Sequence, residues 1–129
     1  MIFVDIDKPK ILIVDDSNVS RRTIISVLEP DKFEIIQTSR GLEALELVKN
    51  MTIDCILLDL LMPELDGFEV LKQLKENNIN IPTIVLSADI QDTTKENVYK
   101  LGACDFVNKP PRKESLNTAL EKALSIKKD

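Results

Sequence analysis

The sequence predicts an α/β protein built on an open, five-stranded parallel sheet with helices on both faces. Short apolar runs that are typical of strands alternate with longer segments of helical spacing, and the runs lie at 11–14, 33–36, 55–58, 83–86 and, more weakly, 104–107. Three of these runs are apolar at nearly every position, which is typical of parallel strands covered on both faces. Five alternations joined by short loops favour a doubly wound sheet.

The segments between the strands carry apolar residues at the spacing of amphipathic helices. We expect helices at 17–28, 42–49, 66–75, 91–101 and 113–126. Ser20 belongs to the face of the first helix that should be buried, and Leu42 and Leu45 to that of the second. The 91–101 segment has the least support, because only Val98 and Leu101 give it an apolar rhythm in a polar run.

Length and charge exclude several classes of protein. A chain of 129 residues suits one domain, which we expect to span 1–129 with a core at about 9–126. No apolar run approaches the roughly 20 residues that span a bilayer, and the start lacks the order of a signal peptide, so we expect a cytoplasmic protein without a membrane partner. The net charge of -5 argues against direct binding of nucleic acid.

The absence of histidine limits the chemistry that this chain can perform. It excludes Ser-His and Cys-His nucleophile systems and metal sites with histidine ligands. Cys55 and Cys104 lie in apolar stretches without CxxC spacing, so we expect buried, reduced thiols rather than a disulfide. Any chemistry must therefore use carboxylates, hydroxyls and lysine.

Polar side chains follow the predicted strands at the sheet edge where doubly wound proteins bind ligands. Asp15 and Asp16 end the first strand, Asp59 the third and Ser87 the fourth, and the fifth leads into Lys109. Three carboxylates that converge repel one another and call for a multivalent cation, and all-oxygen ligation suits Mg²⁺ or Mn²⁺. A carboxylate can also attack a phosphoryl group, provided that nearby cations neutralise the transferring oxygens.

Four motifs occur in an informative order: ILIVDDS at 11–17, DLLMPELDG at 59–67, Ser87-Ala88, and GACDFVNKP at 102–110. Together they resemble the receiver domains of two-component response regulators, over about residues 9–126. The resemblance implies a flavodoxin-like (βα)5 fold with strand order 2-1-3-4-5. It also implies a regulatory phosphoacceptor that is not an enzyme in its own right.

By this resemblance, Asp59 accepts a phosphoryl group from a histidine of a partner kinase or phosphotransfer protein. The family would hold Mg²⁺ with Asp16, Asp59 and the backbone carbonyl of Leu61, and Asp15 would act through a metal-bound water. Lys109 would contact the phosphoryl group. The donor histidine belongs to the partner, which is consistent with its absence from this chain.

The resemblance also implies a switch pair, Ser87 and Phe106. The hydroxyl would move toward the phosphate while the ring turns inward, and an unidentified output protein would read the face formed by helix four, strand five and helix five. The Lys109-Pro110 bond is expected to be cis. Because the chain ends at Asp129 soon after the last helix, we expect a stand-alone, chemotaxis-type receiver, with an excised domain of a longer regulator as the alternative.

Two other functions stay open on the sequence alone. Residues 2–7, Ile-Phe-Val-Asp-Ile-Asp, resemble the nucleophile motif of haloacid-dehalogenase-type hydrolases, with Asp5 and Asp7 as its two carboxylates, although no acidic pair follows Lys109 as that enzyme requires. The second alternative is a pseudo-receiver, a docking module that never takes phosphate. Loss of a site carboxylate, of Ser87 or of Lys109 would favour it, and none is lost.

Overall fold

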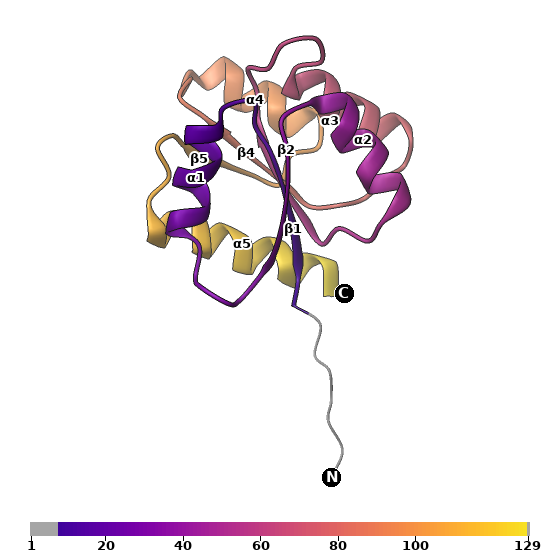
Figure 1. Ribbon diagram of the computed structural model, residues 1–129. Helices are drawn as coiled ribbons and strands as arrows, with labels where there is room; N and C mark the ends of the chain where they lie inside the picture. Colours follow the sequence, from indigo (N-terminus) through magenta and orange to yellow (C-terminus); the bar gives the residue numbers. More distant parts are fainter. Residues whose placement is uncertain (1–7, 129) are drawn as a thin grey trace.

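Strands and helices alternate along the whole described part of the chain, which in this computed structural model is residues 8–128 (Figure 1). The strands are β1 (Lys10–Val14), β2 (Glu34–Thr38), β3 (Cys55–Asp59), β4 (Thr83–Ser87) and β5 (Asp105–Asn108). The helices are α1 (Asn18–Val27), α2 (Gly41–Asn50), α3 (Gly67–Glu76), α4 (Asp92–Lys100) and α5 (Lys113–Lys128). Each predicted segment corresponds to one of these elements.

All five strands pair in parallel, in the order β2-β1-β3-β4-β5. This confirms the predicted α/β fold class and strand order. The order reverses beside β1, because the chain runs from β1 outward to β2 and then returns to β3 on the other side of β1. In such sheets the crevice beyond the carboxyl ends of the strands at this reversal is the usual ligand site.

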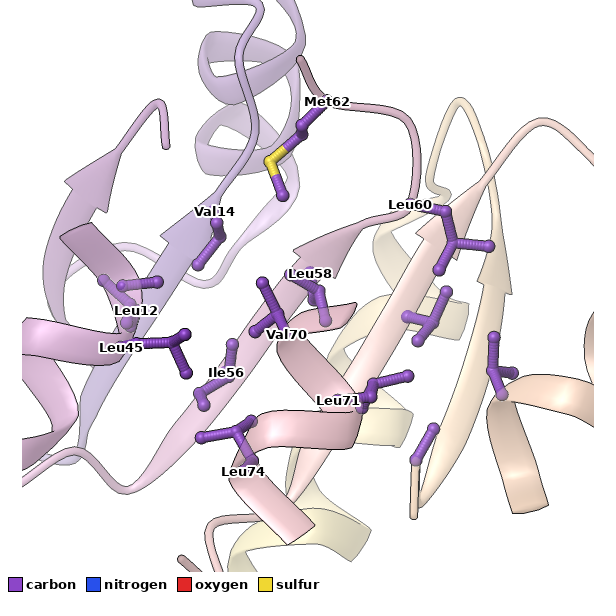
Figure 2. Packing of buried hydrophobic residues seen from close by; sticks show 14 of the residues in the cluster. Leu12, Val14, Leu45, Ile56, Leu58, Leu60, Met62, Val70, Leu71 and Leu74 are labelled. Atoms are coloured by element: carbon purple, nitrogen blue, oxygen red, sulfur yellow. The ribbon is translucent and has the colours of Figure 1, made fainter. Parts of the chain in front are cut away.

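Two apolar clusters, one on each face of the sheet, hold the layers together. On one face, side chains of α2, α3 and α4 pack on alternate residues of the strands, and Figure 2 shows Leu45 of α2 and Val70 and Leu74 of α3 against β1 and β3. On the other face, α1 contributes Ile24 and α5 contributes Leu116, among others. The central strands are buried on both sides, which explains why their sequences read as continuous apolar runs.

The helices follow the predicted pattern with one exception, the orientation of α2. Leu45 is buried as expected, but the side chain of Leu42 is 48% exposed. The buried face of α2 instead carries the small residues Gly41 and Ala44, and a Cβ atom at Gly41 would lie 2.8 Å from both the Leu65 carbonyl oxygen and the Val70 side chain. The expectation for Leu42 was therefore wrong, because only large apolar residues were used to define the buried face.

The remaining expectations from composition concern membranes and thiols. Among residues 8–128, no helix combines the length and apolar character that a transmembrane span requires. Cys55 is buried, as predicted, whereas Cys104 is only half-buried, so the expectation of full burial was wrong for Cys104.

Candidate functional site

Three carboxylates meet at the carboxyl edge of the sheet, beside the point where strand order reverses. Asp15 and Asp16 directly follow β1, and Asp59 is the last residue of the neighbouring strand β3. One carboxylate oxygen of each residue lies within 4.8 Å of the others. Asp15 is buried with 1% of its surface exposed, whereas Asp16 is exposed to solvent. The structure therefore brings together the three acids that the sequence placed at strand ends.

Lys109 supplies the positive charge in this cluster. Its ammonium lies 2.8 Å from Asp15 Oδ2 and 3.2 Å from Asp59 Oδ1. The backbone positions it, because the Lys109 N–H donates to the Ser87 carbonyl at 2.9 Å, and the following bond to Pro110 is cis as expected. Burial lowers the pKa of the Lys109 ammonium, but the hydrogen bond to Asp15 and the charges of both acids outweigh burial and leave that pKa raised.

One lysine does not balance the charge on Asp59. Burial raises the pKa of the Asp59 carboxyl, the Lys109 charge lowers it, and the charges of Asp15 and Asp16 raise it again, so that the pKa lies above its ordinary value of 3.8. Three carboxylates within 4.8 Å of one another, with Lys109 as their ion-pair partner, leave negative charge that a further cation would offset. Because every donor is a hard oxygen, the site fits Mg²⁺ or Mn²⁺ better than a metal that prefers nitrogen or sulfur.

Local hydrogen bonds fix the two loops that carry the acids. The Ser17 side chain caps α1 by accepting the Ser20 N–H at 3.1 Å, while the Ser17 N–H donates to Asp15 Oδ1 at 2.9 Å. On the other loop, Gly67 begins α3 so close to β3 that a Cβ atom there would lie 2.4 Å from the Asp59 carbonyl oxygen. Glycine at this position lets the loop after Asp59 fold back on the strand.

The remaining predicted residues lie around this cluster. Ser87 ends β4, and its buried hydroxyl accepts the Asp89 N–H at 3.0 Å. Phe106 on β5 is half-buried, with the Lys95 ammonium 5.5 Å from its ring centre. Leu61 follows Asp59 by two residues, and its side chain is 73% exposed.

Residues that the sequence analysis did not assign to the site also contact it. The Ser20 hydroxyl donates to Asp15 Oδ2 at 2.5 Å, and the Arg21 guanidinium donates to the Asp15 carbonyl at 2.5 Å. Beyond Ser87, Thr94 donates to Asp89 Oδ2 at 2.8 Å and so ties α4 to the end of β4. A signal existed for Ser20, because a hydroxyl on the apolar face of a helix needs a polar partner.

The alternative nucleophile motif, residues 2–7 with Asp5 and Asp7, lies outside the residues that the structure describes.

Comparisons with known proteins agree with the fold and with the motifs at this edge. The family model of the response regulator receiver domain matches residues 11–121. The transcriptional regulatory protein SrrA of Staphylococcus aureus is 42% identical over 101 residues, which are 78% of this chain and 42% of SrrA. The chain thus spans about two fifths of the length of this curated relative.

Solved structures show the same relationship. The receiver domain of a Francisella response regulator is 30% identical with a TM-score of 0.84, and the alignment covers 93% of this chain and 99% of that one. The Vibrio cholerae chemotaxis protein CheY4 is 28% identical with a TM-score of 0.83, covering 91% and 99% respectively. The chain therefore belongs to the response regulator receiver domain family.

Proposed function

We propose that this protein is a phosphorylation-dependent signalling switch in which Asp59 accepts a phosphoryl group from a histidine of a partner kinase or phosphotransfer protein. The observation that carries the proposal is the cluster of Asp15, Asp16 and Asp59 within 4.8 Å, with the Lys109 ammonium 3.2 Å from Asp59. A lone acidic cluster has many uses, but a lysine ammonium 3.2 Å from Asp59 can neutralise the oxygens of a transferred phosphoryl group, which supports phosphoryl transfer at this edge.

In the proposed reaction the phosphoryl group moves from a histidine nitrogen of the partner to a carboxylate oxygen of Asp59. An oxygen of the Asp59 carboxylate attacks the phosphorus of the phosphohistidine and forms an acyl phosphate bond as the P–N bond breaks. The imidazole nitrogen keeps the electron pair of that bond and takes a proton from solvent. Negative charge builds on the oxygens of the transferring group, and Lys109 neutralises part of it.

Asp16, Asp59 and the backbone carbonyl of Leu61 would hold Mg²⁺, with Asp15 acting through a water. When bound, the cation supplies charge neutralisation for the acids and for the phosphoryl oxygens. Asp59 is 11% exposed and ends a strand that is buried on both faces, so the chain itself holds the nucleophile in a fixed direction. Mn²⁺ fits the same oxygen donors.

The signal would leave the site as a population shift. Phosphate at Asp59 stabilises an arrangement in which the Ser87 hydroxyl turns toward it and Phe106 turns inward, and the face of α4, β5 and α5 then binds or releases an output protein. Phe106 is half-buried, packs against the apolar cluster and has the Lys95 ammonium of α4 5.5 Å from its ring centre, so a turn of the ring would change its contact with α4. We propose a single receiver domain that acts through this face.

The test is the mass of the intact protein after incubation with Mg²⁺ and a small acyl phosphate. Wild type should gain one phosphoryl group, and Asp59→Asn should gain none. Asp66→Asn is the matched control, because Asp66 lies in the same loop and caps α3, and asparagine caps equally well. It should be phosphorylated like wild type.

Three outcomes would contradict the proposal in different ways. Absence of an adduct on wild type would favour a pseudo-receiver, and an equal adduct on Asp59→Asn would place the phosphoryl group elsewhere. Multiple turnover of a phosphomonoester that is abolished by Asp5→Asn, but not by Asp59→Asn, would favour the hydrolase.

A further inference from the structure

Ser20 makes a contact with the acidic cluster that the proposed mechanism has not used. The residue is half-buried on α1, and its hydroxyl donates to Asp15 Oδ2 at 2.5 Å. Asp15 is 1% exposed, so its carboxylate depends on protein donors for most of its hydrogen bonds. Ser20 is therefore one of the few groups that decide how this carboxylate is oriented.

The donors around Asp15 divide unequally between its two oxygens. Oδ2 receives both the Ser20 hydroxyl and the Lys109 ammonium, at 2.5 and 2.8 Å. Oδ1 receives the Ser17 N–H at 2.9 Å. A carboxylate offers about four acceptor positions, two on each oxygen. Within the described contacts, Oδ2 is therefore filled and Oδ1 keeps one position for a further donor.

We propose that Ser20 is a positioning residue for cation binding at this site. Its hydroxyl fills the second position of Asp15 Oδ2 and so presents Oδ1 to a water molecule held by the cation. This inference rests on the proposed function, because it assigns Ser20 a role only if the carboxylate cluster binds Mg²⁺.

Loss of the Ser20 hydroxyl would change the charge distribution of the cluster as well as its geometry. Lys109 is shared between Asp15 and Asp59, at 2.8 and 3.2 Å. Without Ser20, Lys109 is the remaining described donor to Asp15 Oδ2, which strengthens its attachment to Asp15 at the expense of Asp59. The carboxylate also gains freedom to rotate. Both effects weaken the cation site and leave the packing of α1 on the sheet intact.

The test compares Ser20→Ala with wild type by calorimetric titration with Mg²⁺ alone, without a phosphodonor. We expect the Mg²⁺ dissociation constant to rise about tenfold, the lower end of the range for removal of a residue that orients a metal ligand. The rate of phosphorylation by an acyl phosphate should fall at low Mg²⁺ and recover at saturating Mg²⁺. A merely structural role would not produce this dependence on Mg²⁺.

Two variants serve as controls. Ser20→Thr keeps the hydroxyl and should retain the wild-type affinity for Mg²⁺. The extra methyl group has space, because Ser20 lines an open pocket of about 220 Å³. Ser26→Ala removes an exposed hydroxyl from the same helix, one that donates to the Thr23 carbonyl, and should leave Mg²⁺ binding unchanged. Should Ser20→Ala fail to fold, Ser20→Cys replaces it, because a thiol of similar size is a weak donor.

An affinity within twofold of wild type in Ser20→Ala would overturn the inference, and so would an equal loss in Ser26→Ala. These outcomes can be separated from failure of the proposed function. If wild type binds Mg²⁺ and becomes phosphorylated on Asp59 while Ser20→Ala behaves identically, only the role of Ser20 is refuted. If wild type binds no Mg²⁺, the proposed site itself is refuted.

Discussion

At the scale of single residues, the charge of Asp59 opposes folding. Its carboxyl has a raised pKa, caused first by burial and then by the neighbouring acids, against the opposing charge of Lys109. Because the pKa of Asp59 is higher in the folded than in the unfolded protein, the protonated carboxyl stabilises the fold. This stabilisation is complete below the ordinary pKa of 3.8 and is lost as the pH rises through the folded-state pKa. At neutral pH the ionised Asp59 therefore destabilises the protein.

Asp59→Asn should raise the melting temperature at pH 7 in the absence of divalent cations, because it removes this buried charge. The gain should shrink as the pH approaches 3.8, and saturating Mg²⁺ should reverse the order by stabilising wild type alone. Thermal melts followed by circular dichroism between pH 3.5 and 7 would measure this. Glu46→Gln, an exposed acid on α2, should show neither effect. A variant less stable than wild type at every pH without Mg²⁺ would contradict the prediction.

The residues of the site differ in how readily the sequence predicts their place in it. Asp15, Asp16, Asp59 and Lys109 could be placed together, because each lies at the end of a strand or just beyond it and parallel strands share their carboxyl edge. The contact of Ser20 with Asp15 could not, because it depends on the rotation of α1 about its axis. The hydroxyl on an apolar helix face was the only signal, and that signal does not identify its partner.

At the scale of elements, a buried asparagine joins two helices on one face of the sheet. Asn117 of α5 is 7% exposed, and its amide donates to the Val27 carbonyl at 2.8 Å and to the Lys113 carbonyl at 2.7 Å. Its side-chain oxygen accepts the Glu29 N–H at 3.3 Å. Val27 is the last residue of α1, so Asn117 satisfies backbone groups where that helix ends.

Asn117→Ala should lower the free energy of unfolding by about 2 kcal/mol, because it removes three part-buried hydrogen bonds to the backbone, each worth roughly 0.5–1.5 kcal/mol. Urea denaturation should show a lower midpoint with an unchanged slope. Asn50→Ala provides the control, since the Asn50 amide bonds a carbonyl of its own helix at an exposed position, and it should cost no more than about 0.5 kcal/mol. Equal losses in the two variants would show that the link between α1 and α5 carries no special weight.

The elements themselves were predictable because local pattern and global fold agree over most of the chain. The difficulty with α2 arose where small residues matter more than large ones, since Ala44 is buried and Leu42 is exposed. The same applies to α4, whose apolar rhythm is weak because it buries the polar residue Thr94. Thr94 is tolerated there through its bond to Asp89, a tertiary contact that helical periodicity does not reveal.

At the scale of the whole molecule, one chain of contacts runs from the site toward the face that an output protein would read. Ser87 ends β4 beside the Lys109 backbone, the Asp89 N–H donates to the Ser87 hydroxyl at 3.0 Å, and Thr94 donates to Asp89 at 2.8 Å. A movement of Ser87 toward a phosphate would therefore release or pull the first turn of α4. This gives the proposed switch a physical route that can be cut without touching the site.

Thr94→Val should cut this route while keeping the shape of the side chain. The chain contains one tyrosine and no tryptophan, and Tyr99 lies on α4 with 47% of its surface exposed, so intrinsic fluorescence reports on that helix alone. Phosphorylation should change the fluorescence of wild type, and in Thr94→Val this change should be roughly halved. The rate of phosphorylation, followed by the mass of the intact protein, should equal that of wild type. Thr93→Val, an exposed neighbour on the same helix, should behave as wild type. An undiminished fluorescence change in Thr94→Val would mean that α4 responds to the site by another route, through β5 and Phe106.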